Sequence, residues 1–500
     1  MSCHRYEALH TRRDFLAQTG LGLGTAALAQ LFGAEALPAL SSPAGAEPLA
    51  GRPPLSVSPA SFNGQPGLPH FASKAKRVIC LFQSGGPSHL DLFDDKPVLR
   101  ARFNEDLPDS VRRGQRITGM VASQARLAVQ PSKWDFQPGG NCGTAISDLL
   151  PHTRAIADEL CVIRSMQTEA INHDPAITFF QSGSQLPGRP SMGAWVDYGL
   201  GRLNENLPSF VVLVSVNAKR TGQGLLARLW GSGFLPSAHQ GVQFRSAGEP
   251  VLYLNDPAGI TRERRRVMLD SIAELNRLQH AQSGDPEIET RIKQFELAYR
   301  MQRSVPELME LTGEPAAVLE SYGPDVTQPG SFARNCLLAR RLAERGVRFI
   351  QLYHRDWDHH GGLDEHLPNL ARDTDQPSAA LVRDLKQRGL LEDTLVIWGG
   401  EFGRTPYAQG EASREKFGRD HHGKAFSLWL AGGGVKPGIT YGASDDFGFN
   451  VTEHPVHIHD LQATVLHQLG IDHERLTYKF QGRQYRLTDV HGQVVRGILV

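Results

Sequence analysis

The sequence lacks a net charge, and its cysteines lack a paired arrangement. Its 500 residues include 53 Lys and Arg against 53 Asp and Glu, so no long-range field attracts nucleic acid or an anionic membrane surface. The five cysteines show no paired spacing and no haem-binding Cys-x-x-Cys-His, and Cys80 and Cys161 lie inside apolar runs. We therefore expect no nucleic-acid partner, no disulfide framework and no haem, and we interpret the cysteines as core thiols.

Long hydrophobic runs are also absent after the N-terminus. Residues 11–16 are Thr-Arg-Arg-Asp-Phe-Leu, and an uncharged, Gly- and Ala-rich stretch from Ala17 to Ala34 follows, which is typical of a twin-arginine signal. No other apolar run approaches the roughly 20 residues that span a bilayer. The sequence therefore predicts a signal peptide over residues 1–40 and a Pro-, Ser- and Gly-rich linker over 41–73. It also predicts export of the folded chain by the twin-arginine translocase, to the periplasm or beyond.

Short apolar runs recur from residue 74 onward, with helical segments between them. The runs are continuous instead of alternating, as in strands that are buried on both faces of a parallel sheet. The connections between helices and strands are short. One expected helix, for example, ends at Gly346, directly before the apolar run that begins at Val347. We predict one α/β domain over 74–500, a doubly wound, mostly parallel sheet with helices on both faces, with a helical insertion near 261–312. The expected strands are Val78–Phe82, Leu160–Ile163, Phe210–Val214, Val347–Tyr353, Thr394–Trp398 and Phe426–Leu430.

Imidazoles and carboxylates cluster at the ends of these runs. In open α/β sheets, ligands collect outside the carboxyl ends of the strands. Several His and acidic side chains at one rim form a ligand set for zinc, manganese or iron, whereas His454, His457 and His459 are expected to cap a helix or face solvent. The clustered segments are Gln83–Asp91, Asn172–Pro175, His354–His360, Gly399–Thr405 and Arg419–Lys424.

Five strings stand in order along the chain. They are Ser84–Asp91, Gly188–Gly193, Trp357–Asp358 with His360, Gly400–Pro406 and Gly418–His421. Together they resemble a secreted family, the domain-of-unknown-function 1501 family, and the likeness runs from about Arg77 to the C-terminus. That family is similar to a branch of the alkaline phosphatase and sulfatase superfamily. The resemblance implies an alkaline-phosphatase-like fold with one or two divalent ions at the strand ends, where they polarise a phosphate or sulfate ester.

The resemblance also implies which residues hold the metal. Asp358 and His360 match the metal ligands that follow the middle strand of the superfamily, here Val347–Tyr353. Glu401 matches an Asp ligand that follows the strand Thr394–Trp398. His421, with Asp420 beside it, matches the superfamily's last metal ligand. We therefore predict a divalent ion on Asp358, His360, Glu401, Asp420 and His421. Zinc, manganese, magnesium and calcium stay open as its identity.

This sequence departs from the superfamily pattern at three positions. Ser84 stands where a metal-binding Asp is usual, and Phe402 stands where a His is usual, which favours one ion over two. The nucleophile position falls at His173, by register with Ser182-Gly183. The chain has no Cys/Ser-x-Pro-x-Arg string, which excludes an ordinary formylglycine sulfatase. Hydrolysis would then use metal-activated water with His173 as general base, or a histidyl intermediate.

Two functions are consistent with these features, and a third, a redox metalloprotein, is allowed by twin-arginine export but has no Cys cluster to support it. The first is an exported, metal-dependent hydrolase of phosphate or sulfate esters, acting on a small or polymeric anionic substrate. Its expected catalytic residues are His173, Asn172, Arg404 and Lys424. The turn expected to bind the anion comprises Ser84, Gly85, Gly86, Ser88, His89 and Asp91. The second function is a non-catalytic periplasmic protein that binds anions or polysaccharides on the same scaffold.

Overall fold

The computed structural model describes residues 64–500 apart from 116, 217–223, 246–247, 253 and 258. The predicted twin-arginine signal and most of the predicted linker lie outside the described residues. None of the helices in the described part of the chain combines the length and the apolar character that a membrane span needs.

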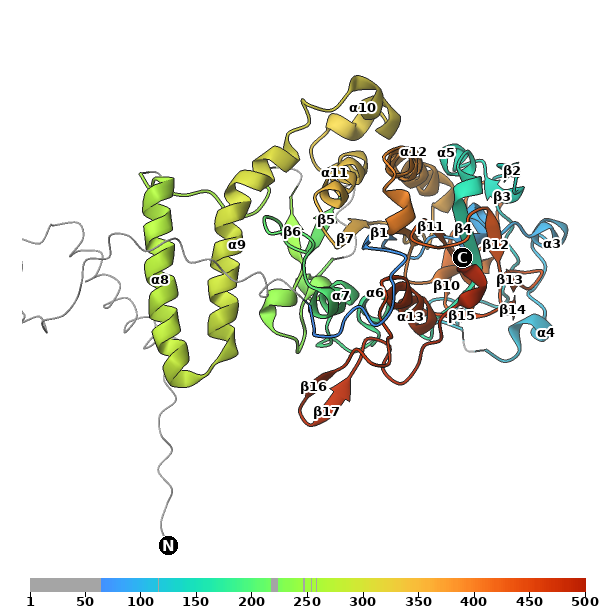
Figure 1. The fold of residues 1–500 in the computed structure, drawn as a ribbon. Helices are drawn as coiled ribbons and strands as arrows, with labels where there is room; N and C mark the ends of the chain where they lie inside the picture. The colour runs from blue at the N-terminus through green and yellow to red at the C-terminus, as the bar shows by residue number, and fades with distance from the viewer. Residues whose placement is uncertain (1–63, 116, 217–223, 246–247, 253, 258) are drawn as a thin grey trace, which may run out of the picture. The chain divides into compact units, whose positions relative to one another are not determined.

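A nine-stranded, mostly parallel sheet forms the centre of the structure (Figure 1). Its order is β12-β4-β11-β8-β1-β7-β5-β6, and β15 pairs with β4. Only β11 runs antiparallel to its neighbours β4 and β8; the other pairs are parallel. The strands are β1 (Arg77–Gln83), β4 (Leu160–Gln167), β5 (Phe210–Val214), β6 (Val242–Phe244), β7 (Phe349–His354), β8 (Thr394–Gly399), β11 (Phe426–Ala431), β12 (Ile439–Tyr441) and β15 (Val456–His457).

Helices cover both faces of this sheet, as the continuous apolar runs predict. Successive side chains of a strand point to opposite faces. In β1, Ile79 and Leu81 belong to one apolar core and Val78, Cys80 and Phe82 to another. The first core includes α11 (Phe332–Glu344) and α12 (Leu363–Gln387), and the second includes α6 (His173–Ser182), α7 (Met192–Leu200) and α13 (Ile458–Gln468). The predicted doubly wound α/β fold is therefore confirmed.

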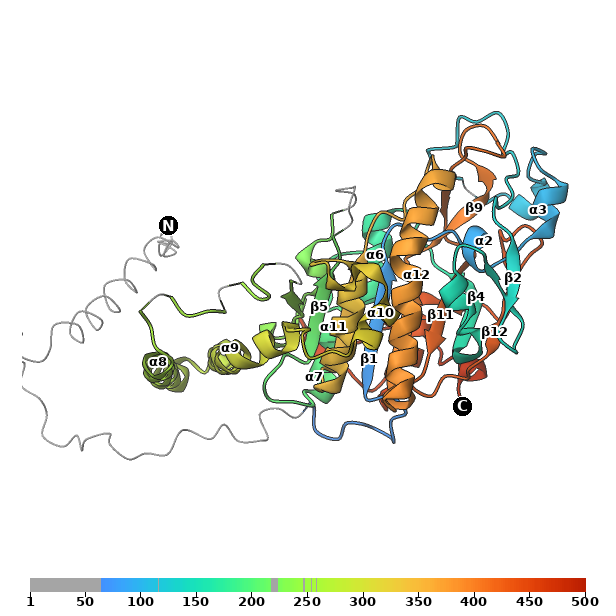
Figure 2. The ribbon, with the colours of Figure 1, turned by 90° about the horizontal axis from the view of Figure 1, so that it is seen from above.

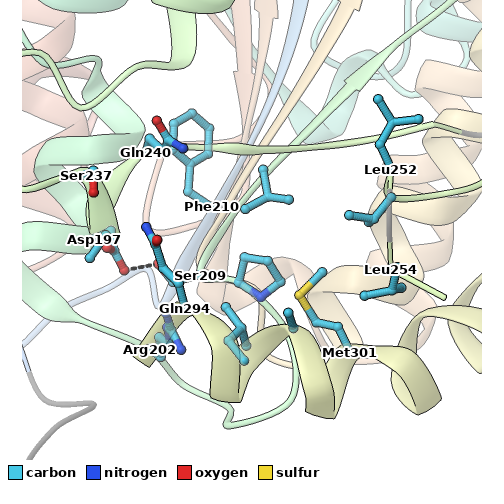
Figure 3. Close-up of a pocket in the computed structure, with 16 residues that line it drawn as sticks. Asp197, Arg202, Ser209, Phe210, Ser237, Gln240, Leu252, Leu254, Gln294 and Met301 are labelled. Carbon is cyan, nitrogen blue, oxygen red and sulfur yellow. Dashed lines mark hydrogen bonds between the residues drawn. The ribbon is translucent and has the colours of Figure 1, made fainter. Parts of the chain in front are cut away.

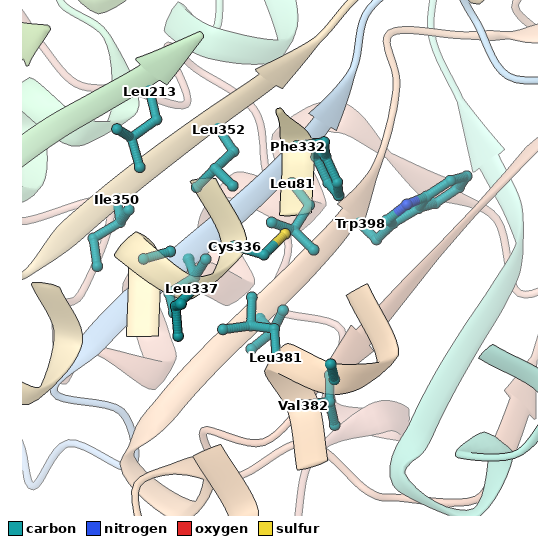
Figure 4. Packing of buried hydrophobic residues seen from close by; sticks show 14 of the residues in the cluster. Leu81, Leu213, Phe332, Cys336, Leu337, Ile350, Leu352, Leu381, Val382 and Trp398 are labelled. Carbon is teal, nitrogen blue, oxygen red and sulfur yellow. The ribbon is translucent and has the colours of Figure 1, made fainter. Parts of the chain in front are cut away.

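The core against α11 and α12 consists of fully buried apolar side chains. Leu81 and Leu352 of the sheet lie near Leu337 of α11 and Leu381 of α12 (Figure 4), and each of the four is fully buried. A buried side chain of this size contributes about 1.5–3 kcal/mol. Of the predicted core thiols, Cys80 and Cys161 are buried, and burial raises the pKa of each thiol to about 12. They are therefore unreactive at neutral pH.

Two long helices fill the predicted insertion, α8 (Arg262–Ser283) and α9 (Pro286–Met309). They meet at Gly284, whose φ of 68° is a conformation that favours glycine, and Asp285 caps the second helix through the N–H of Glu287. Arg266 of α8 bridges to Glu296 of α9. Figure 2 shows the pair side by side.

Shorter elements complete the chain. The helices are α2 (His89–Leu92), α3 (Pro97–Ala101), α4 (Asp109–Arg112), α5 (Pro151–Arg154) and α10 (Ala316–Tyr322). The two-stranded sheets are β2 (Phe136–Gly139) with β3 (Thr144–Ser147), β9 (Gly403–Ala408) with β10 (Arg419–His422), β13 (Ala443–Ser444) with β14 (Val451–Glu453), and β16 (Tyr478–Phe480) with β17 (Arg483–Tyr485). The β9–β10 pair is important for the candidate site, because β9 follows β8 and the pair lies beside the carboxyl ends of the central strands.

Candidate metal centre

Four side chains from three separate segments gather beyond the carboxyl ends of β1, β7 and β8. They are His173, Asp358, His360 and His421, and their ligand atoms all lie within 4.8 Å of one another. His173 is the first residue of α6, Asp358 and His360 lie in the loop after β7, and His421 lies in β10. Three imidazoles with one carboxylate form a ligand set for zinc and neighbouring transition metals.

Each of the three rings is oriented by an oxygen atom at Nδ1. The His173 Nδ1 lies 2.7 Å from Glu401 Oε1, the His360 Nδ1 lies 2.5 Å from Gln409 Oε1, and the His421 Nδ1 lies 2.6 Å from the carbonyl oxygen of Ile171. A carboxylate or carbonyl oxygen only accepts a hydrogen bond, so these partners assign the ring proton to Nδ1. Each neutral ring then presents a lone pair at Nε2.

All three Nε2 atoms face the carboxylate of Asp358. The separations are 3.2 Å from His173, 2.9 Å from His360 and 3.3 Å from His421. With the ring protons on Nδ1, the three Nε2 lone pairs face the carboxylate oxygens of Asp358, and none of these atoms has a proton to donate. Among the described residues, the buried His173 Nε2 has no hydrogen-bond partner. A cation between the four groups satisfies all of them at once, and a carboxylate or carbonyl behind each ligating His is the usual arrangement in metal sites. The residues present therefore fit a divalent metal ion.

The electrostatics of the cluster agree with this fit. Burial alone would raise the pKa of Asp358, but the three imidazoles and Arg404 outweigh burial and hold it well below its usual range. Burial lowers the pKa of His421 to about 4, so this ring is neutral at neutral pH and free to ligate. Burial also opposes protonation of His173, but Asp358 and Glu401 outweigh it and raise the pKa of that ring. A metal ion would compete with that proton.

The turn after β1 supports the cluster from behind. Gly85 donates its N–H to both carboxylate oxygens of Glu401, at 2.9 and 3.2 Å, and Glu401 is fully buried. A side chain on Gly85 would meet the backbone nitrogen of Asp358 at 2.6 Å, and the φ of Gly85 is 122°. Only glycine lets the two loops approach so closely. The turn was expected to cradle an anion, but the N–H of Gly85 is engaged in holding Glu401.

Arg404 is a positioning residue in this structure. It is 1% exposed, and it donates to Asp358 Oδ1 at 2.7 Å and to the carbonyl oxygens of Gly85, Gly86 and Arg419. Burial lowers the pKa of its guanidinium. We expected Arg404 to neutralise a substrate anion, but its donors already hold the loops that carry the cluster.

The ligand set differs from the expected one in three respects. Of the five expected ligands, Asp358, His360 and His421 lie in the cluster. Glu401 stands behind His173 instead, and His173, expected as a general base, takes a place among the ligands. The buried carboxylate of Asp420 points away, accepting from Thr118 and from the N–H of His421.

The other expected site residues lie around the cluster without joining it. Asn172 is the exposed N-cap residue of α6, and Lys424 is exposed. His89 bonds the carbonyl oxygen of Gly448 at 3.0 Å, and Ser88 donates to Asp91 at 2.5 Å. Asp91 forms a fully buried ion pair with Arg419, its Oδ2 lying 2.8 Å from Nε. Asp91, Ser88 and His89 therefore hold the fold around the site instead of facing an anion.

Sequence reasoning missed two groups that orient the ligands. Gln409, directly after β9, lies behind His360, and the backbone carbonyl of Ile171 lies behind His421. A backbone carbonyl leaves no trace in the residue type. Gln409 follows the strand β9, but no spacing in the sequence marks its contact with His360.

Replacing Glu401 by Gln is expected to weaken metal binding by about 10–100-fold, the usual cost of removing the group behind a ligating His. A neutral amide is a weaker acceptor for the His173 ring proton than a carboxylate. The measurement is the dissociation constant of the metal, from competition with a chromophoric chelator. Glu415→Gln, at an exposed position, serves as the control. An unchanged constant in Glu401→Gln would show that Glu401 does not orient His173.

The fold and the site define an α/β protein with a candidate mononuclear metal centre at the strand ends. The chain belongs to the family described as "Protein of unknown function (DUF1501)", which matches residues 75–499. No curated protein matches the chain.

Several solved structures are similar to this chain at low identity. The PsFucS1 sulfatase from Pseudoalteromonas sp. is 12% identical, with a TM-score of 0.33 over 80% of this chain and 68% of that one. The phosphonate monoester hydrolase SpPMH from Silicibacter pomeroyi is 12% identical, with a TM-score of 0.31 over 70% and 71%. The alkaline phosphatase from the Antarctic bacterium TAB5 is 10% identical, with a TM-score of 0.29 over 80% and 98%. Likenesses at this level carry no information on the reaction.

Proposed function

We propose that this protein is an exported hydrolase of phosphate or sulfate esters that depends on one divalent metal ion. One observation carries the proposal: three imidazole Nε2 atoms and the Asp358 carboxylate converge, while an oxygen behind each ring holds the ring proton on the far side. The ester class follows from the resemblance of the five strings to a family that is similar to a branch of the alkaline phosphatase and sulfatase superfamily.

His173, Asp358, His360 and His421 would hold the ion. When bound, it would act as a Lewis acid on an ester oxygen and lower the pKa of a water molecule. Glu401, Gln409 and the carbonyl of Ile171 favour the ring tautomer that leaves Nε2 toward the ion, and a proton held on the His173 Nε2 would leave when the ion binds. Arg404 fixes Asp358 from the buried side.

The cluster is more open on one side than on the other. The side chains of Asp358 and His360 are each 27% exposed and that of His173 is 16% exposed, whereas that of His421 is 3% exposed. A substrate would therefore approach over Asp358 and His360. Lys424, exposed on the same segment as His421, is available to attract an anionic group from solution.

His173 does not suit the role of general base or nucleophile that its position suggested. Its Nδ1 is engaged with Glu401 and its Nε2 faces the centre of the cluster. A ring that ligates an ion through Nε2 has no free lone pair for a proton or for phosphorus. A water molecule at the open side is the nucleophile that the arrangement favours.

A specific observation favours a second function. Four protein side chains would be enough to ligate a zinc ion fully, as in structural zinc sites, whereas catalytic sites keep an open position. In addition, the buried Arg404 donates to Asp358 and to backbone carbonyls, and the N–H of Gly85 is bonded to Glu401, so these donors are not available to a substrate. The second candidate is therefore a non-catalytic anion- or polysaccharide-binding protein whose metal ion stabilises the strand ends.

The state of the coordination shell separates these functions. We expect elemental analysis to find about one divalent ion per chain, and the cobalt(II)-substituted protein to change its visible spectrum when inorganic phosphate or sulfate is added, because an open position binds the anion. Turnover of a phosphate or sulfate monoester by the same preparation would complete the test. A four-coordinate spectrum that anions leave unchanged, with no turnover, supports the second function. Absence of any bound metal would overturn both metal-based functions.

A further inference from the structure

One face of helix α8 is apolar and exposed. Four of its large apolar side chains are each 43–59% exposed: Val267, Met268, Leu275 and Leu278. Successive residues of an α-helix are turned by about 100°, so these four lie within an arc of about 100° on one side of the helix. We call these four residues the α8 stripe. Single exposed apolar side chains are ordinary, but four aligned on one face mark an interaction surface.

The opposite face of α8 is the one that packs within the chain. Leu269 and Ala273 are the buried residues of α8, and they lie almost opposite the stripe around the helix. Figures 1 and 2 show α9 between α8 and the central sheet. Leu297 and Met301 of α9 line a pocket together with Phe210 of β5 (Figure 3). The inward faces of both helices are therefore in use, and the α8 stripe points away from the body of the chain.

The α8 stripe is symmetrical along the helix, because the mean of its four residue numbers is 272. If a second α8 lies antiparallel across this centre, Met268 meets the partner's Leu275. Val267 then meets the partner's Leu278, so every side chain of the stripe is covered. The same patch is used on both copies, as a two-fold dimer requires. Ser271, exposed on the same face beside the centre, is small enough to let the two helices approach closely.

The charge at the amino-terminal end of α8 favours the antiparallel direction. Arg264 is exposed on the same face as the stripe. Among the described residues it has no ion-pair partner, whereas Arg265 and Arg266 are paired with carboxylates. In an antiparallel pair, Arg264 lies beside the carboxyl-terminal end of the other α8 and its exposed Asp285, where a cation is stabilised. In a parallel pair, Arg264 would meet its own copy and be repelled.

We propose that the α8 stripe is a dimerisation surface whose occupant is the α8 of a second copy of this chain, packed antiparallel. The two α8 helices form the centre of a layer, with the α9 of each copy on the outside. One pair of 22-residue helices gives an interface at the small end of the range for specific contacts, so we expect a dissociation constant of about 1–100 μM. The inference is independent of the proposed function, because no residue of α8 belongs to the metal-ligand cluster.

Analytical ultracentrifugation of the full chain, from about 0.1 to 100 μM, tests the proposal. We expect the average mass to rise from that of one chain toward that of two. Leu275→Glu combined with Leu278→Glu should weaken the association by about 100-fold or more, since it places unpaired carboxylates in the contact. Both leucines are exposed in the single chain, so the variant should keep its fold, which circular dichroism checks. Leu186→Glu, at a position that is 75% exposed outside α8, is the matched control.

Spin labels attached to Ser283→Cys measure the direction of the pair, with Cys3 and Cys142 replaced by Ser so that the label has one site. Ser283 is exposed and lies off the stripe. In an antiparallel dimer centred on residue 272, the two labelled positions lie about 33 Å apart along the helices, whereas in a parallel dimer they lie about 10 Å apart. Arg264→Glu should also weaken an antiparallel dimer about tenfold, because it places a carboxylate beside Asp285. A separation near the shorter value overturns the antiparallel arrangement.

Three other results would overturn the proposal. The first is a full chain that stays monomeric at the highest concentration. The second is association that survives Leu275→Glu with Leu278→Glu, which places the dimer contact elsewhere. The third is a monomeric chain that sediments with vesicles of phosphatidylcholine and phosphatidylglycerol and loses that binding in the same double variant, which assigns the α8 stripe to a membrane surface. None of these results bears on metal content or turnover, so the proposed function stands or falls separately.

Discussion

Asp358→Asn is expected to leave the protein without its metal ion. The substitution removes the only carboxylate of the cluster, and with it the negative charge that all three Nε2 atoms face. The loss of affinity should exceed the 10–100-fold that a group behind a ligand contributes. The new amide can also donate hydrogen bonds to the imidazole lone pairs, so the metal-free cluster becomes satisfied without a cation.

Two measurements check this expectation. Elemental analysis should fall from about one ion per chain to a small fraction, and chelator should lower the thermal midpoint of the unaltered protein but not of Asp358→Asn. The second effect follows from linkage: an ion present at about 1,000 times its dissociation constant stabilises the folded state by about 4 kcal/mol. Asp135→Asn, with 77% of its side chain exposed, is the control. Full metal content in Asp358→Asn would place the ion elsewhere.

We expect Arg419→Met to lower the free energy of unfolding more than any other substitution proposed for this protein. Both side chains of the Arg419–Asp91 pair are 0% exposed, and Arg419 also donates to the carbonyl oxygens of Gln130 and Thr405, each at 2.9 Å. Removing one partner of a buried ion pair leaves an uncompensated charge and costs about 3–5 kcal/mol. That is a large part of the 5–15 kcal/mol by which folded proteins are usually stable.

Urea denaturation followed by fluorescence and circular dichroism measures this change. The control is Arg303→Gln, which breaks an exposed pair with Glu307 and should change the free energy of unfolding by about 0–1 kcal/mol. The double variant with Asp91→Leu should recover part of the loss, because it removes the stranded carboxylate. A loss below about 1 kcal/mol in Arg419→Met would mean that Asp91 finds another partner or is protonated.

Much of the fold was predictable from local patterns. The runs Val78–Phe82 and Thr394–Trp398 are continuous and apolar, and the structure makes both of them central strands. The predicted run from Val347 begins two residues before β7, because a strand's ends depend on its neighbours more than on its own residues. The antiparallel direction of β11 was not predictable, since the direction of a buried strand leaves no mark on its composition.

The sequence predicted which segments come together at the site, but not which of their side chains are metal ligands and which orient those ligands. Segments that follow parallel strands share one edge of the sheet, so Asp358, His360, Glu401 and His421 were expected to meet there, with His173 as a general base. Which of them ligates and which stands behind depends on side-chain direction over a few ångströms. Glu401 accepts from Gly85 and orients His173, and no spacing in the sequence distinguishes that role from ligation.

The sequence alone determined that apolar runs would be buried on both sides, and that imidazoles and carboxylates would collect where those runs end. Both follow from hydrophobic burial and strand periodicity, which act over a few neighbouring residues. Only the tertiary structure decided that Asp358 has three ring nitrogens around it and that Arg404 and Asp91 belong to the scaffold. Those facts depend on distances between segments up to hundreds of residues apart, and the packing of the whole domain sets them.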